Sequence, residues 1–351
     1  MMLLRSAQPA DLEGIHLLAR QAGITTLPPE HDFLLKRIAL SQSSFQAAGK
    51  PPFNAYYFFV LEHHEINQPR RIVGVCGIEG RAGAEIPFYS FTCTHSQWKC
   101  DTLGVENDYQ FLQLSNDNSE KTELCTLYLQ PEYRYNGHGL LLSRARLLFL
   151  AQFPKRFTET VIAEIRGVSY NNGRVPFWDH LGKHFFHIPF KKADKLSMIT
   201  DKQFIRDLLP PLPICVNLLP KAAQAVIGKP HAASVPAMRI LEREGFKSNH
   251  TIDIFDGGPT IEASINQIKT VQQNRLVTIR AIENKLPSAA KHSFTPWILA
   301  TTDLDFRATM GEIILDENTE SIVMDNDTAQ CLAVEQNQSL RIVSLLDQGS
   351  Q

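Results

Sequence analysis

The chain has 351 residues, with 35 lysines and arginines against 37 aspartates and glutamates, and a formal net charge of −2. Hydrophobic residues make up 43% and charged residues 21% of it, which excludes disorder, collagen and coiled coil as its main state. The near-neutral charge argues against a dedicated nucleic-acid-binding protein. No apolar run approaches the length of about 20 residues that a helix needs to cross a bilayer. The first residues lack the charged-then-apolar order of a signal peptide. We expect a soluble, cytoplasmic protein without nucleic-acid or membrane partners.

The six cysteines are scattered along the chain and form no C-x-x-C pair. This spacing predicts reduced thiols rather than a disulfide framework or a zinc ribbon. Cys125 lies on a predicted strand without an apparent base partner, so we do not expect it to be a nucleophile.

The N-terminal residues predict a short strand followed by a helix, because Leu12, Ile15, Leu18 and Ala19 recur at helical spacing. Asp11 is suited to the cap or the first turn of that helix. A helix is expected after Pro28-Pro29, through residues 33–40. Two strands that form a hairpin follow at 55–61 and 71–78, and then a polar, mostly acidic stretch at 101–122 with a candidate loop at 114–119.

The middle of the chain alternates strands and helices. The expected elements are strand 124–129, helix 140–153, strand 161–165, helix 236–244, strand 251–255 and turn 256–259. Gly245 stands where a helix-ending C′ glycine is expected. Beyond residue 272 only short β-like runs follow, at 275–282, 297–301, 311–315 and 340–346. We therefore expect one domain over residues 1–272, subdivided near 200–213, and a small β-rich domain over 273–351.

One connection carries a pattern suited to a ligand. The predicted strand 124–129 leads into an R-x-x-G-x-G sequence made by Arg134, Gly137 and Gly139, and an apolar helix follows. Glycines allow a backbone to approach a ligand closely, and a helix start offers N–H groups and a positive dipole end. The pattern is neither a P-loop nor a complete G-x-G-x-x-G. It fits a pyrophosphate, with a plain strand–turn–helix corner as the alternative.

Strand, glycine loop and apolar helix together resemble the acyl-CoA-binding signature of the GNAT-like N-acyltransferases. Further blocks resemble the arginine N-succinyltransferase family in order and spacing; they lie at residues 123–129, 161–168, 176–178, 181–186 and 252–260. The resemblance covers residues 1–272 and is weak beyond them. It implies an α+β fold: a GNAT-like mixed sheet flanked by helices, with a small C-terminal β-rich domain.

The resemblance also implies a reaction, the transfer of a succinyl group from succinyl-CoA to the α-amino group of L-arginine, the first step of arginine catabolism by the succinyltransferase pathway. Succinyl-CoA would be a co-substrate, with no further cofactor. The family positions match Leu127 as a succinyl-CoA contact and His231 as a proton donor. From the residues alone, His231 is an ordinary loop histidine. Transfer to ornithine or another amine, or a catalytically silent CoA-binding subunit, stays open, as do homo- and hetero-oligomers.

Four residues are candidates for binding the acceptor. Glu164 and Arg166 lie near the end of a strand that borders the acceptor pocket in a GNAT-like fold, or they form an ordinary Glu-x-Arg pair on an exposed strand end. Asp256 and its neighbour Asp253 offer carboxylates for a guanidinium, with turn formation as the equal alternative.

A metal site is not expected. His180, His184 and His187 would share a face of one continuous helix. We expect Gly182 to end that helix and residues 185–186 to be extended, so that the three rings diverge, whereas zinc needs convergent ligands.

Overall fold

The computed structural model describes residues 1–21, 27–65, 69–286 and 296–345. The chain divides into two compact units, each with its own strands, helices and core. The first unit consists of Met1–Gly80, Leu124–Thr158 and Ile265–Gln351, and the second of Arg81–Glu123 and Glu159–Ser264. The boundary expected at residue 272 stays a prediction.

The strands of the first unit follow the order β14-β15-β11-β16-β12-β13-β1-β2-β3-β6. Their bounds are β1 Met2–Ser6, β2 Tyr56–His63, β3 Arg71–Glu79, β6 Thr122–Leu129, β11 Arg275–Glu283, β12 Trp297–Thr301, β13 Arg307–Gly311, β14 Ile313–Asp316, β15 Ser321–Asp325 and β16 Ser339–Ser344. The predicted hairpin is present as the antiparallel pair β2–β3, although residues 66–68 of its connection lie outside the described residues. β11 and β15 run parallel, so the sheet is mixed.

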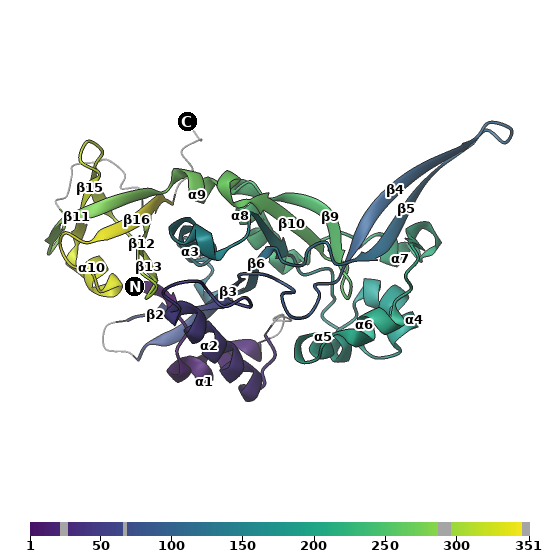
Figure 1. Ribbon diagram of the computed structural model, residues 1–351, viewed down its shortest axis with the longest axis horizontal. Coiled ribbons are helices and arrows are strands. Elements are labelled where there is room, and N and C mark those ends of the chain that lie inside the picture. Colours follow the sequence, from purple (N-terminus) through teal and green to yellow (C-terminus); the bar gives the residue numbers. More distant parts are fainter. Residues whose placement is uncertain (22–26, 66–68, 287–295, 346–351) are drawn as a thin grey trace. The chain divides into compact units, whose positions relative to one another are not determined.

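Helices α1 and α2 pack on the β2–β3 hairpin (Figure 1), where Ile15, Leu18 and Leu34 share a core with Phe58 and Val75. The helices of this unit are α1 Leu12–Ala19, α2 His31–Gln46, α3 His138–Gln152, α9 Lys269–Gln273 and α10 Asn326–Leu332. The C-terminal strands and α10 have a core of their own, which includes Val277, Ile279 and Leu299. The expected strand 340–346 is β16, and its last expected residue lies outside the described part.

The proposed cap at Asp11 needs a correction. The Asp11 carboxylate accepts the backbone N–H of Gln8 at 2.7 Å and binds the guanidinium of Arg5, also at 2.7 Å. It therefore caps the short 3₁₀ turn Pro9–Asp11, while α1 itself has no side-chain cap at Asp11.

The strands of the second unit follow the order β7-β10-β9-β4-β5-β8, and the first two residues of β6 pair in parallel with β7. Their bounds are β4 Ser90–Cys100, β5 Val105–Ser115, β7 Thr160–Glu164, β8 Ile214–Cys215, β9 Lys247–Asp253 and β10 Pro259–Ser264. The helices are α4 Lys183–Phe186, α5 Phe190–Ile199, α6 Gln203–Leu208, α7 Lys221–Gln224 and α8 Val235–Arg243. Gly245 follows α8 with φ +105°, as its predicted C′ role requires.

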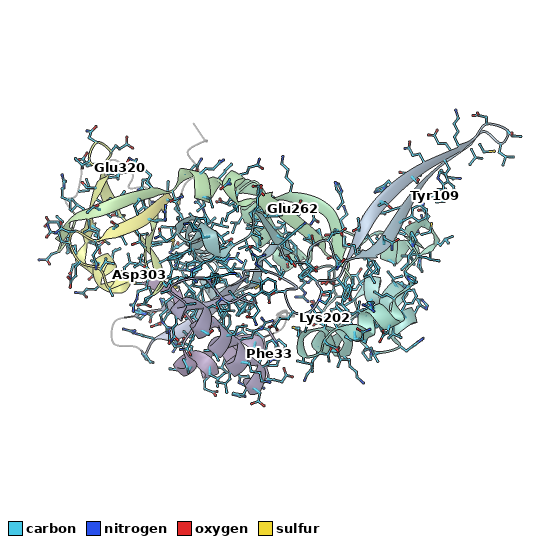
Figure 2. The ribbon with its side chains drawn as sticks, in the orientation of Figure 1. Phe33, Tyr109, Lys202, Glu262, Asp303 and Glu320 are labelled. Carbon is cyan, nitrogen blue, oxygen red and sulfur yellow. The ribbon has the colours of Figure 1, made fainter. Side chains whose placement is uncertain are left out.

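The long pair of strands β4 and β5 is not predicted by the sequence pattern. β4 and β5 pair along 11 residues each and form a slender two-stranded ribbon (Figure 1). Side chains such as Tyr109 project from it on both sides (Figure 2). Only its base is buried, at Ser90, Phe91 and Leu112. Because neither face of the ribbon packs on a core along most of its length, the residues show no apolar alternation.

The segment with three histidines also differs from the expectation. Residues 178–182 form a π-helical turn that continues directly into α4, so Gly182 does not end the helix and Phe185–Phe186 are helical. Gly182 is needed for close packing, since a Cβ there would lie 2.3 Å from the Trp178 ring. The helix ends at His187, which has φ +52°.

The expected α+β class is confirmed, with a mixed sheet and flanking helices. Within the described residues, no helix is long and apolar enough to cross a membrane.

Candidate functional site

The strand before the glycine loop is distorted at one residue. Thr126 in β6 has φ +52°, a conformation that a β-branched residue adopts only when its surroundings enforce it. The Tyr56 hydroxyl holds the Thr126 hydroxyl at 3.2 Å in a buried contact. The regular pleat is thus interrupted directly before Leu127, the residue matched to succinyl-CoA.

The glycine loop leads into α3 as expected. Gly137 is the N-cap of α3 with φ +80°, and no side chain of the described residues caps this helix start. A Cβ on Gly137 would lie 2.9 Å from the Leu345 side chain, whereas a Cβ on Gly139 would meet nothing within 4 Å. Gly137 therefore serves the local fold, and Gly139 leaves open space over the first turn of the helix.

Arg134 is exposed and anchored to the same strand end. Its Nε donates to the carbonyl of Leu129 at 2.9 Å, and its guanidinium lies 5.8 Å from the centre of the Tyr128 ring. In the first unit, Leu127, Arg134 and the two glycines thus lie along a single strand–loop–helix connection.

The second unit contains a group of buried carboxylates around the turn between β9 and β10. Asp256 uses one carboxylate oxygen to accept the N–H of Gly167 at 2.7 Å and the other to accept the N–H of Gly258 at 2.8 Å. The two backbones cross so closely that a Cβ on Gly258 would lie 2.1 Å from the Ile165 carbonyl oxygen. Asp256 therefore holds this crossing together, which favours the turn-forming alternative for its role.

Glu164 differs from Asp256. It ends β7 opposite Thr260 of β10. Its Oε1 is buried and, like the buried Oγ1 of Thr260, has no hydrogen-bond partner among the described residues. Because unpaired buried polar atoms are costly, two of them on facing positions indicate a place for a ligand that donates hydrogen bonds.

The charges near Glu164 reinforce this indication. Burial raises the pKa of Glu164 well above its usual range, and the nearby Asp253 and Glu123 raise it further, while Lys202 opposes them. Burial also raises the pKa of Asp194 on α5 to about 7, with Asp253 as the next cause and Arg166 opposing. The region therefore favours a bound cation, which would relieve the repulsion between these acids.

Arg166 lies near Asp194 and Asp256, and His231 lies near Arg166. The backbone N–H of His231 donates to the backbone carbonyl of Arg166 at 2.8 Å. The Arg166 guanidinium donates to Ser169 Oγ at 2.7 Å. The Ala233 N–H donates to His231 Nδ1 at 3.1 Å, so the neutral ring carries its proton on Nε2. Burial lowers the pKa of His231, and the Arg166 cation lowers it further. A hydrogen bond with the Ser169 backbone opposes these two effects, and the lowered pKa favours the neutral ring.

The second unit brings together Glu164, Arg166, Asp256 and His231, residues that are up to 92 positions apart in the chain. Sequence reasoning did not identify Thr126, Asp194 or Thr260. No local pattern marks them, since their relevance comes from a backbone dihedral angle, a raised pKa and an unpaired hydroxyl.

The family comparison covers almost the whole chain. A profile of the arginine N-succinyltransferase beta subunit matches residues 2–270, and one of the C-terminal domain of that subunit matches residues 275–344. An arginine N-succinyltransferase of Photorhabdus laumondii is 39% identical over 349 residues, 98% of both chains. One from an Enterobacter strain is 40% identical over 281 residues, 80% of both chains.

A solved structure supports the same relationship. The arginine/ornithine succinyltransferase subunit AI from Pseudomonas aeruginosa superposes with a TM-score of 0.87 at 32% identity, and the alignment covers 99% of each chain.

Proposed function

The chain belongs to the arginine N-succinyltransferase beta subunit family, and we infer that it transfers the succinyl group of succinyl-CoA to the α-amino group of L-arginine. The products are N2-succinyl-L-arginine and CoA, and the reaction begins arginine catabolism by succinylation. The observation that carries this conclusion is 39% identity over 349 residues to a relative of that name.

We propose that the strand–loop–helix connection of the first unit binds succinyl-CoA. The open space over Gly139 and the uncapped start of α3 suit a pyrophosphate, which helix N-termini bind through backbone N–H groups. Arg134, exposed beside the loop, adds a positive charge. Leu127 follows the distorted Thr126, and backbone N–H groups of such a strand suit the oxygen of the thioester.

The proposed reaction is a direct transfer in a ternary complex. The neutral α-amine attacks the thioester carbonyl carbon, and the carbonyl oxygen takes up the negative charge. The C–S bond then breaks, the amide remains on arginine, and the amine loses its proton to solvent. His231 in its imidazolium form donates a proton to the departing sulfur and is left as the neutral ring, which takes up a proton from solvent before the next turnover.

The acceptor requirements fit Glu164. Arginine carries its guanidinium at the end opposite the reacting amine, and a carboxylate forms a two-point contact with a guanidinium that an ammonium cannot reproduce. The unpaired Glu164 Oε1 and Thr260 Oγ1 are two acceptors on facing strands. Arg166 is half-buried and lies near Asp256 and Asp194, and its guanidinium suits the α-carboxylate of the acceptor. Asp256 contributes by fixing the turn.

A thiol-release assay tests the reaction. Succinyl-CoA and acetyl-CoA are each combined with arginine, ornithine, lysine and a buffer blank. We expect thiol release to be fastest with succinyl-CoA and arginine, with N2-succinylarginine detected by mass spectrometry. Absence of thiol release with every pair would instead favour a catalytically silent subunit.

Ornithine is a second candidate acceptor. The solved relative with TM-score 0.87 is described as an arginine/ornithine succinyltransferase subunit. The same assay decides between the two, because a site that reads the guanidinium gives a higher kcat/KM for arginine than for ornithine.

A further inference from the structure

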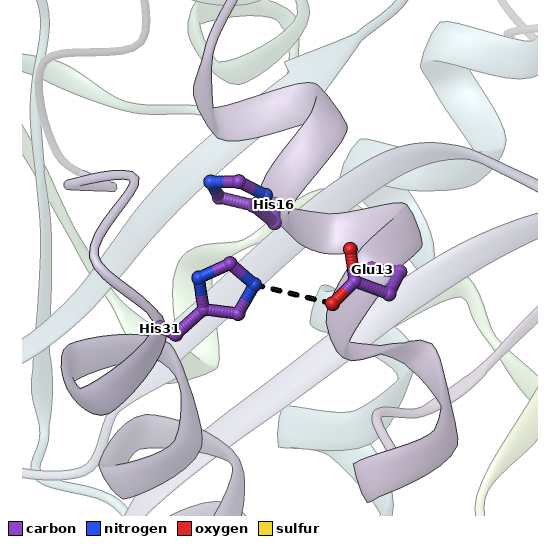
Figure 3. Close-up of side chains that lie close together, drawn as sticks. All are labelled: Glu13, His16 and His31. Atoms are coloured by element: carbon purple, nitrogen blue, oxygen red, sulfur yellow. Dashed lines mark hydrogen bonds and ion pairs between the residues drawn. The ribbon is translucent and has the colours of Figure 1, made fainter.

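Three side chains at the α1–α2 junction meet on the surface of the first unit, in a region that the proposed reaction does not use. Glu13 and His16 lie one turn apart on α1, and His31 is the first residue of α2. Figure 3 shows the three side chains turned toward one another. One ligand atom from each lies within 4.8 Å of the other two.

The contacts within this group are close. His31 Nε2 lies 3.1 Å from Glu13 Oε1, and the centres of the His16 and His31 rings are 4.2 Å apart. Within the described ranges, no other group of three histidine, cysteine or acidic side chains brings its ligand atoms together in this way. The histidines at 180, 184 and 187, which the sequence singled out, do not form such a group.

The donor set suits a transition metal. Two imidazoles and one carboxylate are ligands for Zn²⁺, Co²⁺ or Ni²⁺, whereas Mg²⁺ and Ca²⁺ prefer oxygen ligands alone. Three protein ligands leave a coordination position for water. The Glu13 and His31 side chains are 77% and 48% exposed, so a hydrated ion can reach the site without any movement of the core.

We propose that Glu13, His16 and His31 form a surface site for a divalent transition metal, with Zn²⁺ as the reference ion. The metal would join α1 to the start of α2. Because it binds the folded arrangement, it would also stabilise the first unit.

The alternative is an ordinary surface ion pair between Glu13 and protonated His31. Such a pair contributes little at an exposed position. Metal binding is expected to weaken as pH falls, because coordinating imidazoles must be neutral. Two protonated rings in contact would also repel each other, whereas one metal ion can bind both rings.

The test uses full-length protein without a histidine tag, freed of metal with a chelator. Zn²⁺ is titrated by calorimetry, and Co²⁺ by its visible absorption, which reports the coordination directly. We expect one site per chain, a higher Tm with Zn²⁺, and weaker binding at pH 6 than at about pH 7.5.

Variants identify the ligands. His16→Ala and His31→Ala should each weaken binding by at least about tenfold, since loss of outer-shell partners alone costs about 10–100-fold. Glu13→Gln should alter the Co²⁺ spectrum. His184→Ala, at an exposed histidine of the second unit, should bind like the unmodified protein.

Binding equal in His16→Ala and His184→Ala would overturn the proposal, as would the lack of a Co²⁺ spectrum in the unmodified protein. Circular dichroism checks that each variant is folded. Neither outcome depends on succinyl transfer, so this proposal and the proposed function can fail separately.

Discussion

The two units differ in the kind of surface that their candidate sites offer. In the first unit, the candidate donor region is shaped by the backbone: Thr126 and Gly137 both have positive φ, and Gly139 leaves space at a helix start. In the second unit, the candidate acceptor region is shaped by charge, since Glu164 and Asp194 are carboxyl groups with raised pKa values. Backbone N–H groups suit a phosphate, and buried carboxylates suit a cation.

Each candidate region lowers the stability of the folded chain for a different reason. In the first unit the reason is backbone conformation, since a positive φ at a threonine is unfavourable. In the second unit the reason is desolvation, since Glu164 Oε1 and Thr260 Oγ1 are buried without partners among the described residues. A bound acceptor would relieve the second cost.

The largest effect is expected at His231. His231→Ala should lower kcat by about 10²- to 10⁴-fold, the usual range for loss of a general acid. The KM for succinyl-CoA should stay near that of the unmodified protein, because the proposed donor site lies in the other unit. Steady-state kinetics measure both constants. An unchanged kcat in a folded variant would show that His231 is not the proton donor.

A substitution at Gly139 tests the donor site without disturbing the local fold. A Cβ there meets nothing within 4 Å in the protein, so Gly139→Val should raise the KM for succinyl-CoA without lowering Tm. Loss of one hydrogen bond to a charged group costs about 1.5–3 kcal/mol, or about 10–100-fold. Gly49→Val, also at an open glycine of the first unit, is the matched control. Equal KM values in both variants would remove the loop from the donor site.

The KM for arginine should fall as pH rises. Burial and neighbouring acids raise the pKa of Glu164, and a bound guanidinium favours the ionised form. Arginine binding is thus expected to release a proton, and its KM should fall as pH rises. Glu164→Gln should lose this dependence, which KM measurements between about pH 5.5 and 8 would reveal. A dependence retained in Glu164→Gln would assign it to another group.

A smaller effect concerns stability. Asp194 has a pKa of about 7 in the folded chain, above the about 3.9 of an unfolded aspartate. The folded state therefore loses stability as pH rises from about 4 to about 7. Asp194→Asn should raise Tm at pH 8, with a gain that shrinks toward pH 4. Asp207→Asn, at an exposed position on α6, is the control. A gain that does not change with pH would contradict this origin.

Much of the first unit's candidate site could be predicted from the sequence. The strand 124–129, the glycine pattern and the apolar helix are contiguous, so local periodicity and turn chemistry identify them. The predicted start of the helix was close, since α3 begins at His138. The φ of Thr126 was not predictable, because a tertiary contact with Tyr56, 70 positions away, accompanies it.

The second unit was harder to predict. Glu164 and Thr260 become neighbours only through antiparallel pairing of distant strands. The sequence predicts a helix end at Gly182, whereas close packing against Trp178 explains this glycine. The β4–β5 ribbon lacks a buried face along most of its length, so it left no alternating pattern. Local signals identify single elements, and long-range contacts decide which side chains meet.

The arginine-to-ornithine ratio of kcat/KM in Glu164→Gln tests the central claim most directly, with Glu262→Gln as its control. Glu262 is on β10 in the same unit, where its carboxylate pairs with Lys121 at 2.9 Å. Loss of a hydrogen bond to the guanidinium costs about 1.5–3 kcal/mol. We predict that Glu164→Gln lowers kcat/KM for arginine by about 10–100-fold and for ornithine by less, so that the ratio narrows, while Glu262→Gln leaves it unchanged. A ratio unaffected by Glu164→Gln would contradict the account, because the guanidinium would then be recognised elsewhere.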